Sequence, residues 1–514
     1  MMSKAEAMTT DRSKSRGNRW ILLAALILLL TGLAIRLYDL TDAPLDFHPV
    51  RQLRSAMIAR GLYFENLEGV PDWQREMAVR QANGLEALEP QILETMVAFT
   101  YRIVGQEILW AARVYSVVFW LAGGIGLFLL ARRLAGAGAL FTLAYFLFLP
   151  FGVQASRSFQ PDPLMVMLTI FAVLALDHWF SAKQPGWRLT LLTGVLGGLA
   201  VLVKIPAAFF LAGAFLGLTL AENRLPSVLR DGKAWVIVLL FMLPAGVYYG
   251  NWMVFEGVGG GESWRFFVGS LLTSPRFYLD WLAFVERIVG YAALAGALIG
   301  LVLFDQRGRA LLLGLFCSYA AYGLTFTYHI ATHNYYSLPL VAIIALGLAA
   351  PGKVLLENIG QRVRTAPALQ ALAAGIGLFA LLLPLRTARG ILAGIDYRPE
   401  VGYWQALGEV LEHRSDLMEI SHDYGYRLEY YGWVDGAAWP TTEDLHLLEI
   451  LGQNGGEASL EVVAQQLEGR SLFVVTILSD LDRLPTLKSY LEQRPVFASG
   501  DDYIIYDLRP IEDS

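Results

Sequence analysis

Long apolar segments are the sequence feature that most limits what this chain can fold into. They recur from Trp20 onward, and many reach the ~20 residues that a helix needs to cross ~30 Å of hydrocarbon. Hydrophobic residues make up 55% of the 514 residues, and charged residues only 17%. This balance excludes a soluble protein of this length. We therefore expect a mainly α fold, a polytopic membrane helix bundle.

We expect about eleven membrane spans in this bundle. They lie near residues 20–37, 108–130, 138–154, 163–180, 189–203, 205–220, 234–252, 283–304, 310–328, 335–350 and 366–385. The stretch 189–220 is apolar throughout except at Lys204-Ile205-Pro206. We expect a hairpin there, because a single helix of that length would overshoot the bilayer.

The basic residues predict the orientation of the bundle. Residues 1–19 form a basic tail that we expect in the cytoplasm, and the first span lacks a small-residue cleavage site and should remain as a signal anchor. Basic pairs such as Arg132-Arg133 then lie in cytoplasmic connections. An odd number of spans puts the C-terminus outside. We expect a multi-pass protein of the plasma (inner) membrane.

Two longer segments are expected on the outer side. Inside the bundle domain 20–385, the loop 38–107 has helical periodicity at 50–62, 72–85 and 91–104, which predicts amphipathic helices lying in the membrane interface. The segment 386–514 predicts an extracytoplasmic α/β domain. Its candidate strands are 417–421, 472–476 and 503–506, and its candidate helices are 459–467 and 484–493.

Charge and cysteine content exclude several classes of function. The formal net charge of -6 gives no reason to expect a nucleic-acid partner. Cys317 is the one cysteine, so an intrachain disulfide, a cysteine zinc site and a CxxC redox pair are excluded. Its apolar surroundings predict that this thiol packs in a core.

A dense polar cluster follows the first span, within Pro44–Tyr63. It contains Asp46, His48, Arg51 and Gln52. A carboxylate or an imidazole can take the proton of an attacking hydroxyl, and an arginine can hold a phosphate through two hydrogen bonds. The cluster therefore predicts chemistry at the membrane surface. The alternative interpretation is a solvated loop with a helix cap.

Several short motifs follow one another within residues 20–350. They are Arg54-Ser55-Ala56-Met57-Ile58-Ala59-Arg60, Glu89-Pro90, Gly105-Gln106-Glu107 with Trp110-Ala111-Ala112-Arg113 and Ser116, Ser156-Arg157, Pro161-Asp162, Leu202-Val203-Lys204, and His333-Asn334-Tyr335-Tyr336-Ser337-Leu338-Pro339. Their order resembles that of the GT-C membrane glycosyltransferases of family 39, which include protein O-mannosyltransferases and the lipid A aminoarabinose transferase.

The resemblance implies an inverting enzyme that moves a sugar from a polyprenyl-phosphate donor to an extracytoplasmic protein, lipid or glycan. It implies no certain cofactor and leaves a divalent metal open. The catalytic candidates are Asp46, as the base, His48 and Asp162. The candidates for binding the donor phosphate or the substrate are Arg51, Gln52, Arg157, Lys204, His333, Tyr335 and Tyr336.

The chain departs from the family pattern in its first loop. Family members carry an Asp-Glu pair where this chain has Arg51 and Gln52, and the nearest acid is Asp46. The alternative function is therefore a non-catalytic GT-C-fold protein that binds lipid-linked sugars or assists cell-surface polysaccharide export. A transporter is a weaker alternative, because the sequence shows no convincing internal repeat.

Simpler interpretations stay open for single residues. Asp162 precedes Pro163 and suits a helix N-cap, Lys204 can extend its amine to the membrane surface, and His333 suits a polar loop. The aromatic-rich stretch 421–433 either faces a carbohydrate or forms an ordinary strand–helix junction.

The predicted topology has a direct test. Cysteines introduced by Asp72→Cys and Asp435→Cys should react with a membrane-impermeant thiol reagent in intact cells, because both are expected outside. A cysteine introduced by Arg307→Cys should not react. Opposite labelling of the first two positions would contradict the odd number of spans.

Overall fold

The computed structural model divides into two compact units, which we describe separately. It describes residues 4–86, 88–222, 224–255, 267–363, 366–450 and 459–509. The helical unit comprises Met1–Leu40, Arg113–Arg157 and Pro161–Gly394. The mixed unit comprises Thr41–Ala112, Ser158–Gln160 and Ile395–Ser514.

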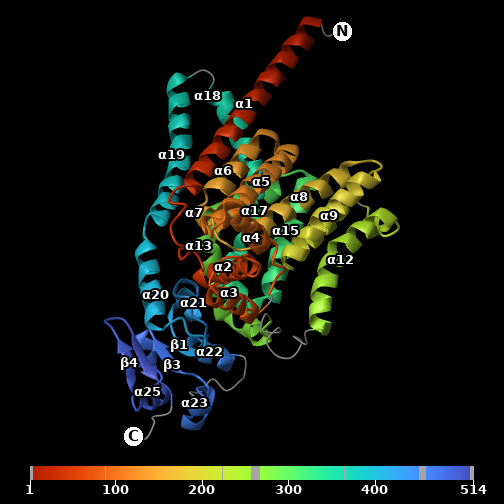
Figure 1. Cartoon of the computed structure of the whole chain (residues 1–514). Helices are drawn as coiled ribbons and strands as arrows, with labels where there is room; N and C mark the ends of the chain where they lie inside the picture. The colour runs from red at the N-terminus through yellow and green to blue at the C-terminus, as the bar shows by residue number, and fades with distance from the viewer. Residues whose placement is uncertain are drawn as a thin grey trace, which may run out of the picture. The chain divides into compact units, whose positions relative to one another are not determined.

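The helical unit has helices over every expected span (Figure 1). Its helices are α1 (Lys4–Arg36), α5 (Trp110–Ala135), α6 (Ala139–Phe148), α7 (Pro150–Ala155), α8 (Asp162–Ser181), α9 (Trp187–Val203), α10 (Ala207–Ala221), α11 (Leu225–Val228), α12 (Gly232–Phe255), α13 (Pro275–Val289), α14 (Tyr291–Leu303), α15 (Gln306–Thr325), α16 (Thr327–Thr332), α17 (Leu338–Gly347), α18 (Ala349–Val363) and α19 (Pro367–Leu392). Within the described residues, six helices are long and apolar enough to cross a membrane, or seven if a bent pair is one span. The count of about eleven crossings stays a prediction.

Several expected spans are broken helices. The expected span over 283–304 is not one straight helix, because α13 and α14 meet at 91°. The bend falls at Gly290, whose φ of 77° is in the region that glycine reaches without strain. Pro150 separates α6 from α7, since its ring cannot continue the helix before it. The hairpin expected at 204–206 is a true break, with α9 ending at Val203 and α10 starting at Ala207.

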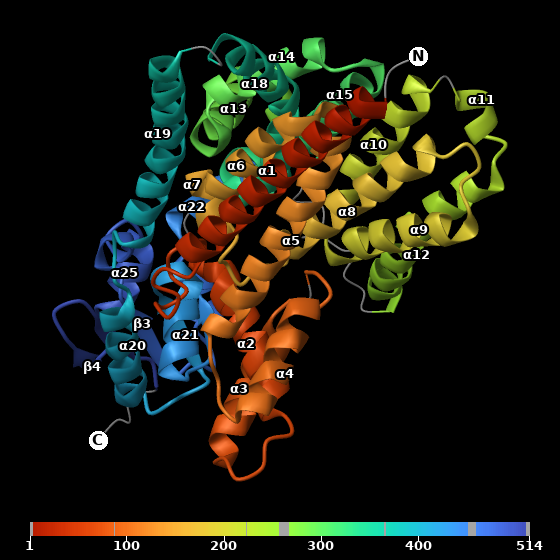
Figure 2. The ribbon, with the colours of Figure 1, turned by 90° about the horizontal axis from the view of Figure 1, so that it is seen from above.

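Close helix packing joins the bundle. Figure 2 shows α8 among α5, α9 and α10. Helices α10 and α15 approach so closely that a Cβ on Gly213 would lie 2.3 Å from the carbonyl oxygen of Gly314. Such small residues allow backbones to touch, which supplies packing energy where lipid removes the hydrophobic driving force.

In contrast to the expected core position, Cys317 on α15 is exposed.

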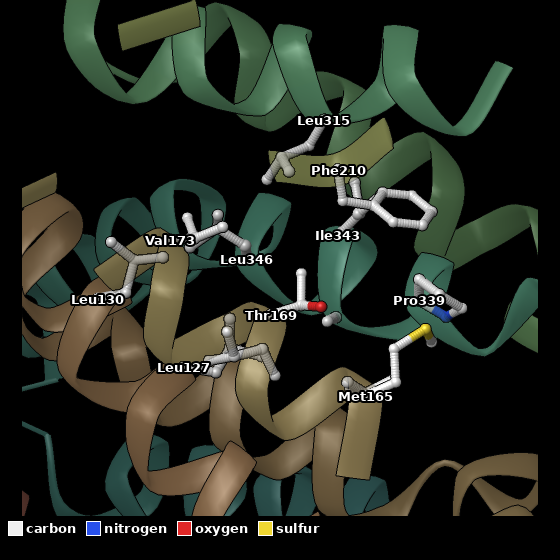
Figure 3. Close-up of a pocket in the computed structure, with 13 residues that line it drawn as sticks. Leu127, Leu130, Met165, Thr169, Val173, Phe210, Leu315, Pro339, Ile343 and Leu346 are labelled. Carbon is white, nitrogen blue, oxygen red and sulfur yellow. The ribbon is translucent and has the colours of Figure 1, made fainter. Parts of the chain in front are cut away.

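A small cavity lies inside the helical unit between α5, α8, α10, α15 and α17 (Figure 3). Its volume is about 40 Å³, and its lining is apolar apart from Thr169. The Thr169 hydroxyl has no hydrogen-bond partner. Its lining offers a single polar group and no charged side chain.

The mixed unit contains a five-stranded sheet and nine helices in its described residues. The helices are α2 (Pro49–Phe64), α3 (Asp72–Gly84), α4 (Ile92–Val104), α20 (Arg398–Val410), α21 (Tyr426–Gly432), α22 (Thr442–Ile450), α23 (Leu460–Gln466), α24 (Leu478–Leu481) and α25 (Pro485–Leu491). The strands are β1 (Leu417–Ile420), β2 (Gly436–Ala438), β3 (Leu472–Val475), β4 (Val496–Ser499) and β5 (Ile504–Asp507). The candidate strands and helices of the tail coincide with β1, β3, β5, α23 and α25.

The sheet is mixed, in the order β2-β1-β3-β5-β4. β1 runs parallel to β2 and β3, whereas β5 runs antiparallel to β3 and β4. Helices α23 and α25 bury Val463 and Leu487 against Phe473 of β3. Every residue of β1 and β3 is buried, which fits the continuous apolar runs of parallel strands.

Helix α2 differs from the amphipathic helix that the sequence predicted. Buried residues lie on all of its sides and include the polar Gln52, Arg54, Ser55 and Arg60. The apolar spacing was visible in the sequence, but the partners of the polar face were not. The loop 41–112 also forms one compact unit with 395–514, whereas the sequence placed it in the bundle domain.

Arg60 explains how the loop and the tail form one unit. Its guanidinium lies 3.7 Å from the ring centre of Tyr430 and 4.1 Å from that of Trp433. It also pairs with Glu107 at 3.1 Å and donates to the backbone oxygen of Tyr430 at 2.6 Å. Cation–π contacts strengthen when they are desolvated, so this clamp ties α2 to α21.

We expect Arg60→Met to lower the free energy of unfolding of the mixed unit by about 3–5 kcal/mol, because Glu107 would lose its partner. Hydrogen exchange of 426–432 should accelerate in the full-length protein. Arg75→Met is the matched control, since the Arg75–Asp72 pair is exposed and should contribute less than about 1 kcal/mol. Equal exchange in both variants would contradict the clamp.

Candidate functional site

The first loop holds Asp46 through Gln52. The Gln52 side chain is fully buried, and its amide nitrogen donates to the backbone oxygen of Phe47 at 2.7 Å and to an Asp46 oxygen at 3.4 Å. The Gln52 oxygen accepts from the backbone N–H of Phe159 at 3.0 Å. Gln52 was expected to bind substrate; its hydrogen bonds here are internal, and its role stays a prediction.

His48 has a strained backbone at the start of α2. Its φ of 48° and ψ of 67° are left-handed, and Pro49 follows as the first helical residue. Its carbonyl accepts from the N–H groups of Arg51 and Gln52. A left-handed conformation costs a non-glycine residue about 1–3 kcal/mol, and such strain is concentrated at functional sites. The loop that carries Asp46 therefore has one enforced geometry.

Arg51 forms an ion pair with Glu89. Its guanidinium contacts the two Glu89 oxygens at 2.7 and 3.0 Å, and both side chains are largely buried. Glu89 belongs to the Glu89-Pro90 motif, so the sequence singled out the partner without indicating the pair. Next to it, Glu94 accepts from Ser55 at 2.7 Å, and burial raises the pKa of this carboxyl.

In the helical unit, Asp162 and Lys204 form a buried ion pair. The Lys204 amine lies 2.9 and 3.1 Å from the two Asp162 oxygens. The N-cap interpretation of Asp162 is wrong, because Pro161 occupies that position and Asp162 is the first residue of α8. Lys204 is also buried, so it does not extend to the membrane surface.

Two tyrosines of the His333–Pro339 motif lie over this pair. The Lys204 amine is 5.1 Å from the Tyr335 ring centre and 5.0 Å from that of Tyr336. His333 packs edge-on against Tyr335 with ring centres 5.7 Å apart. The structure thus brings Asp162, Lys204, Tyr335 and Tyr336 into one cluster, the tyrosine–lysine cluster.

His329 is a member of this cluster that the sequence reasoning missed. Its ring stacks on Tyr336 at 4.9 Å and lies 5.1 Å from His333. The spacing of four residues, one helical turn, was the signal available in the sequence. Within the described part of the chain, no group of three or more acidic, histidine or cysteine side chains is arranged to hold a metal ion. The divalent metal stays an open expectation.

Arg157 lies at the outward end of the α7 segment. The side chain is buried, and its guanidinium donates to the backbone oxygen of Asp39 at 2.8 Å. Arg36, one turn from Asp39, donates to Ser156 at 2.7 Å. Two cations therefore converge where α1 and α7 end. The phosphate-binding role expected for Arg157 stays a prediction.

The aromatic stretch 421–433 forms a strained strand–helix junction after β1. Asp423 and Tyr424 have φ values of 55° and 58°. At the end of the neighbouring strand, the Thr476 hydroxyl donates to Ser421 at 3.0 Å. Beneath them Glu419 is fully buried, and this burial with nearby Asp435 raises its pKa to about 8, so the carboxyl is protonated at neutral pH. The sequence predicted the junction but not the buried acid.

Comparisons with known proteins agree with this geometry. A sequence-family model described as dolichyl-phosphate-mannose-protein mannosyltransferase matches residues 89–249. No curated protein sequence matches the chain significantly. ArnT from Cupriavidus metallidurans, solved bound to undecaprenyl phosphate, superimposes with a TM-score of 0.56 at 16% identity, over 95% of this chain and 97% of that one. The chain therefore shares the GT-C fold.

A second GT-C structure supports the same fold. The archaeal oligosaccharyltransferase AglB from Archaeoglobus fulgidus, in complex with an inhibitory peptide and a dolichol-phosphate, gives a TM-score of 0.55 at 13% identity. The match covers 93% of this chain and 71% of AglB. The GT-C resemblance is thereby confirmed for the fold, whereas the roles of the individual site residues stay predictions.

The Asp162–Lys204 pair of this GT-C bundle can be tested by stability. Lys204→Met leaves a buried carboxylate without its cation, and we expect a loss of about 3–5 kcal/mol in the free energy of unfolding. The double variant Asp162→Asn/Lys204→Met should recover most of this loss. Thermal unfolding in detergent measures both effects.

Lys233→Met is the control for this pair, because Lys233 is a membrane-edge lysine that donates to the Pro185 backbone oxygen. It should unfold close to the wild-type temperature. If Lys204→Met did the same, the buried pair would not contribute to stability.

Proposed function

We propose that this protein is an integral membrane glycosyltransferase. It transfers a sugar from a polyprenyl-phosphate donor to an extracytoplasmic acceptor with inversion at the anomeric carbon. The observation that carries the proposal is the tyrosine–lysine cluster, in which a buried lysine is fixed by Asp162 and flanked by Tyr335 and Tyr336. A buried cation of this kind is expensive to maintain, which favours a functional role.

Lys204 and Arg157 are proposed to stabilise the leaving phosphate. As the bond between the anomeric carbon and the phosphate oxygen breaks, negative charge grows on the phosphate. Preorganised cations in a poorly hydrated site stabilise that charge without reorganisation. Tyr335 and Tyr336 present ring faces that can pack on a sugar, and His333 lies at the edge of the same cluster.

Asp46 is proposed as the general base, with His48 as its neighbour. The acceptor hydroxyl gives its proton to the carboxylate while its oxygen attacks the anomeric carbon. Gln52 and the strained backbone of His48 fix the loop, so the carboxylate has little freedom to turn away. Arg51 is paired with Glu89 as Lys204 is paired with Asp162, and it stays a third candidate for the phosphate.

The second candidate function is a non-catalytic protein that binds lipid-linked sugars. One observation favours it: Arg51 and Gln52 stand where relatives carry an acidic pair, and both make internal contacts. Purified protein incubated with a panel of undecaprenyl-phosphate sugars separates the two functions. An enzyme releases undecaprenyl phosphate, whereas a binding protein retains the intact donor.

We expect Asp46→Asn to reduce the rate of sugar transfer by about 10²–10⁴-fold, because the amide cannot accept the proton. Thermal stability should stay near the wild-type value, since asparagine can still accept from Gln52. Asp72→Asn, at an exposed acid of the same unit, should leave the rate unchanged. Nearly normal turnover in Asp46→Asn beside an inactive His48→Ala or Asp162→Asn would move the base elsewhere.

A further inference from the structure

A groove lies between α1 and α19 on the surface of the helical unit. One wall is formed by residues 31–38 at the end of α1, and the other by residues 379–389 of α19. The groove encloses about 600 Å³. It contains none of the residues of the tyrosine–lysine cluster, so the proposed transferase reaction does not account for it.

The protein itself leaves α19 uncovered. None of the residues in the most apolar stretch of this helix is buried, and Phe379 is 65% exposed. The helix is anchored near its end, where Ala388 and Leu392 pack against Val153 of α7. In a bilayer, hydrocarbon chains must therefore fill the space between α19 and α1.

Two arginines stand at one end of this apolar groove. Arg386 and Arg389 both line it, and the Arg389 guanidinium lies 5.5 Å from the ring centre of Tyr38. Neither arginine has a carboxylate partner among the described residues. Arginine binds phosphate through paired, charge-assisted hydrogen bonds, so an apolar channel ending in two such groups complements a lipid with a phosphate head.

The position of these cations is unusual for simple membrane anchors. The predicted topology puts the end of α19 on the outer side, where lysine and arginine are normally depleted. Arginines that serve only to mark the membrane boundary would be expected at the opposite end. Their place on the outer side, at the mouth of a groove, favours binding of an anionic group.

We propose that the groove between α1 and α19 binds an anionic phospholipid of the surrounding bilayer. Its phosphate contacts Arg386 and Arg389, and its acyl chains lie against Ile35, Phe379 and Leu382. A bilayer phospholipid is favoured over the lipid-linked donor because the groove lies among the most lipid-exposed helices, where bulk lipid is the most concentrated ligand. The lipid would act as a structural component that packs α19 against α1.

The test uses full-length protein in nanodiscs of phosphatidylcholine with a minor fraction of phosphatidylglycerol. Native mass spectrometry after release from the nanodisc counts the phosphatidylglycerol molecules that stay bound. Arg386→Gln/Arg389→Gln should lower the retention of one such molecule by about tenfold or more, since each charge-assisted contact contributes about 1.5–3 kcal/mol.

Two further variants separate the groove from surface charge. Ala34→Trp fills the groove from the α1 side and keeps both arginines, so it should also lose the lipid. Leu30→Trp is the matched control, because Leu30 is exposed on α1 outside the groove and should retain the lipid. Elution volume and thermal unfolding of all variants should match the wild type apart from the stabilisation that the lipid provides.

Three results would overturn the proposal. Equal phosphatidylglycerol retention in all variants would mean that only loose boundary lipid is present. If Ala34→Trp kept the phosphatidylglycerol while Arg386→Gln/Arg389→Gln lost it, the lipid would be attracted by surface charge and not bound in a groove. Displacement of phosphatidylglycerol by an equimolar amount of undecaprenyl phosphate would assign the groove to a polyprenyl-phosphate lipid.

Discussion

An ionised side chain inside an apolar bundle must find its counter-charge within the protein, and helix α8 shows how this requirement organises the structure. Near its start, Asp162 pairs with Lys204 of the α9–α10 connection. Near its end, the buried Asp177 pairs with Arg133 of α5 at 2.6 Å and with Arg307 of α15 at 2.8 Å. Because an unpaired charge would be costly at either end, α8 fixes its neighbours in position and register.

The sequence predicted the helices well, because a helix that crosses lipid must satisfy its own backbone and therefore appears as an uninterrupted apolar run. It predicted bends poorly. Gly290 and Pro150 were visible, yet hydropathy is the same whether an apolar run is straight or bent by 91°. The full burial of α2 was also missed. Periodicity identifies the apolar face of a helix but does not identify partners such as Tyr430 that lie far along the chain.

For the candidate site, sequence reasoning found residues but not their pairings. Asp162 and Lys204 were selected separately, as a catalytic candidate and a phosphate ligand, and their contact across 42 positions could not be derived from spacing. Arg51 and Glu89 were likewise selected in separate motifs, and neither motif indicated their ion pair across 38 positions. Local proximity is a weak guide wherever helices bring distant segments together. His329 was missed although it lies one helical turn before His333, because this spacing alone did not indicate the stacking on Tyr336.

The departure in the first loop has a chemical consequence. An acid at position 52 would place a second carboxylate beside Asp46, and two acceptors cannot hydrogen-bond each other unless one takes up a proton. Glutamine removes this conflict, because its amide donates to Asp46 and Phe47 while its oxygen accepts from Phe159. The exchange of an acidic pair for Arg51 and Gln52 therefore leaves a single carboxylate in the loop, held by donors. This arrangement fits the proposal that Asp46 is the base. The Asp46 carboxylate keeps the negative charge that the reaction needs, and the Gln52 amide that supports it stands where the family pattern has an acid.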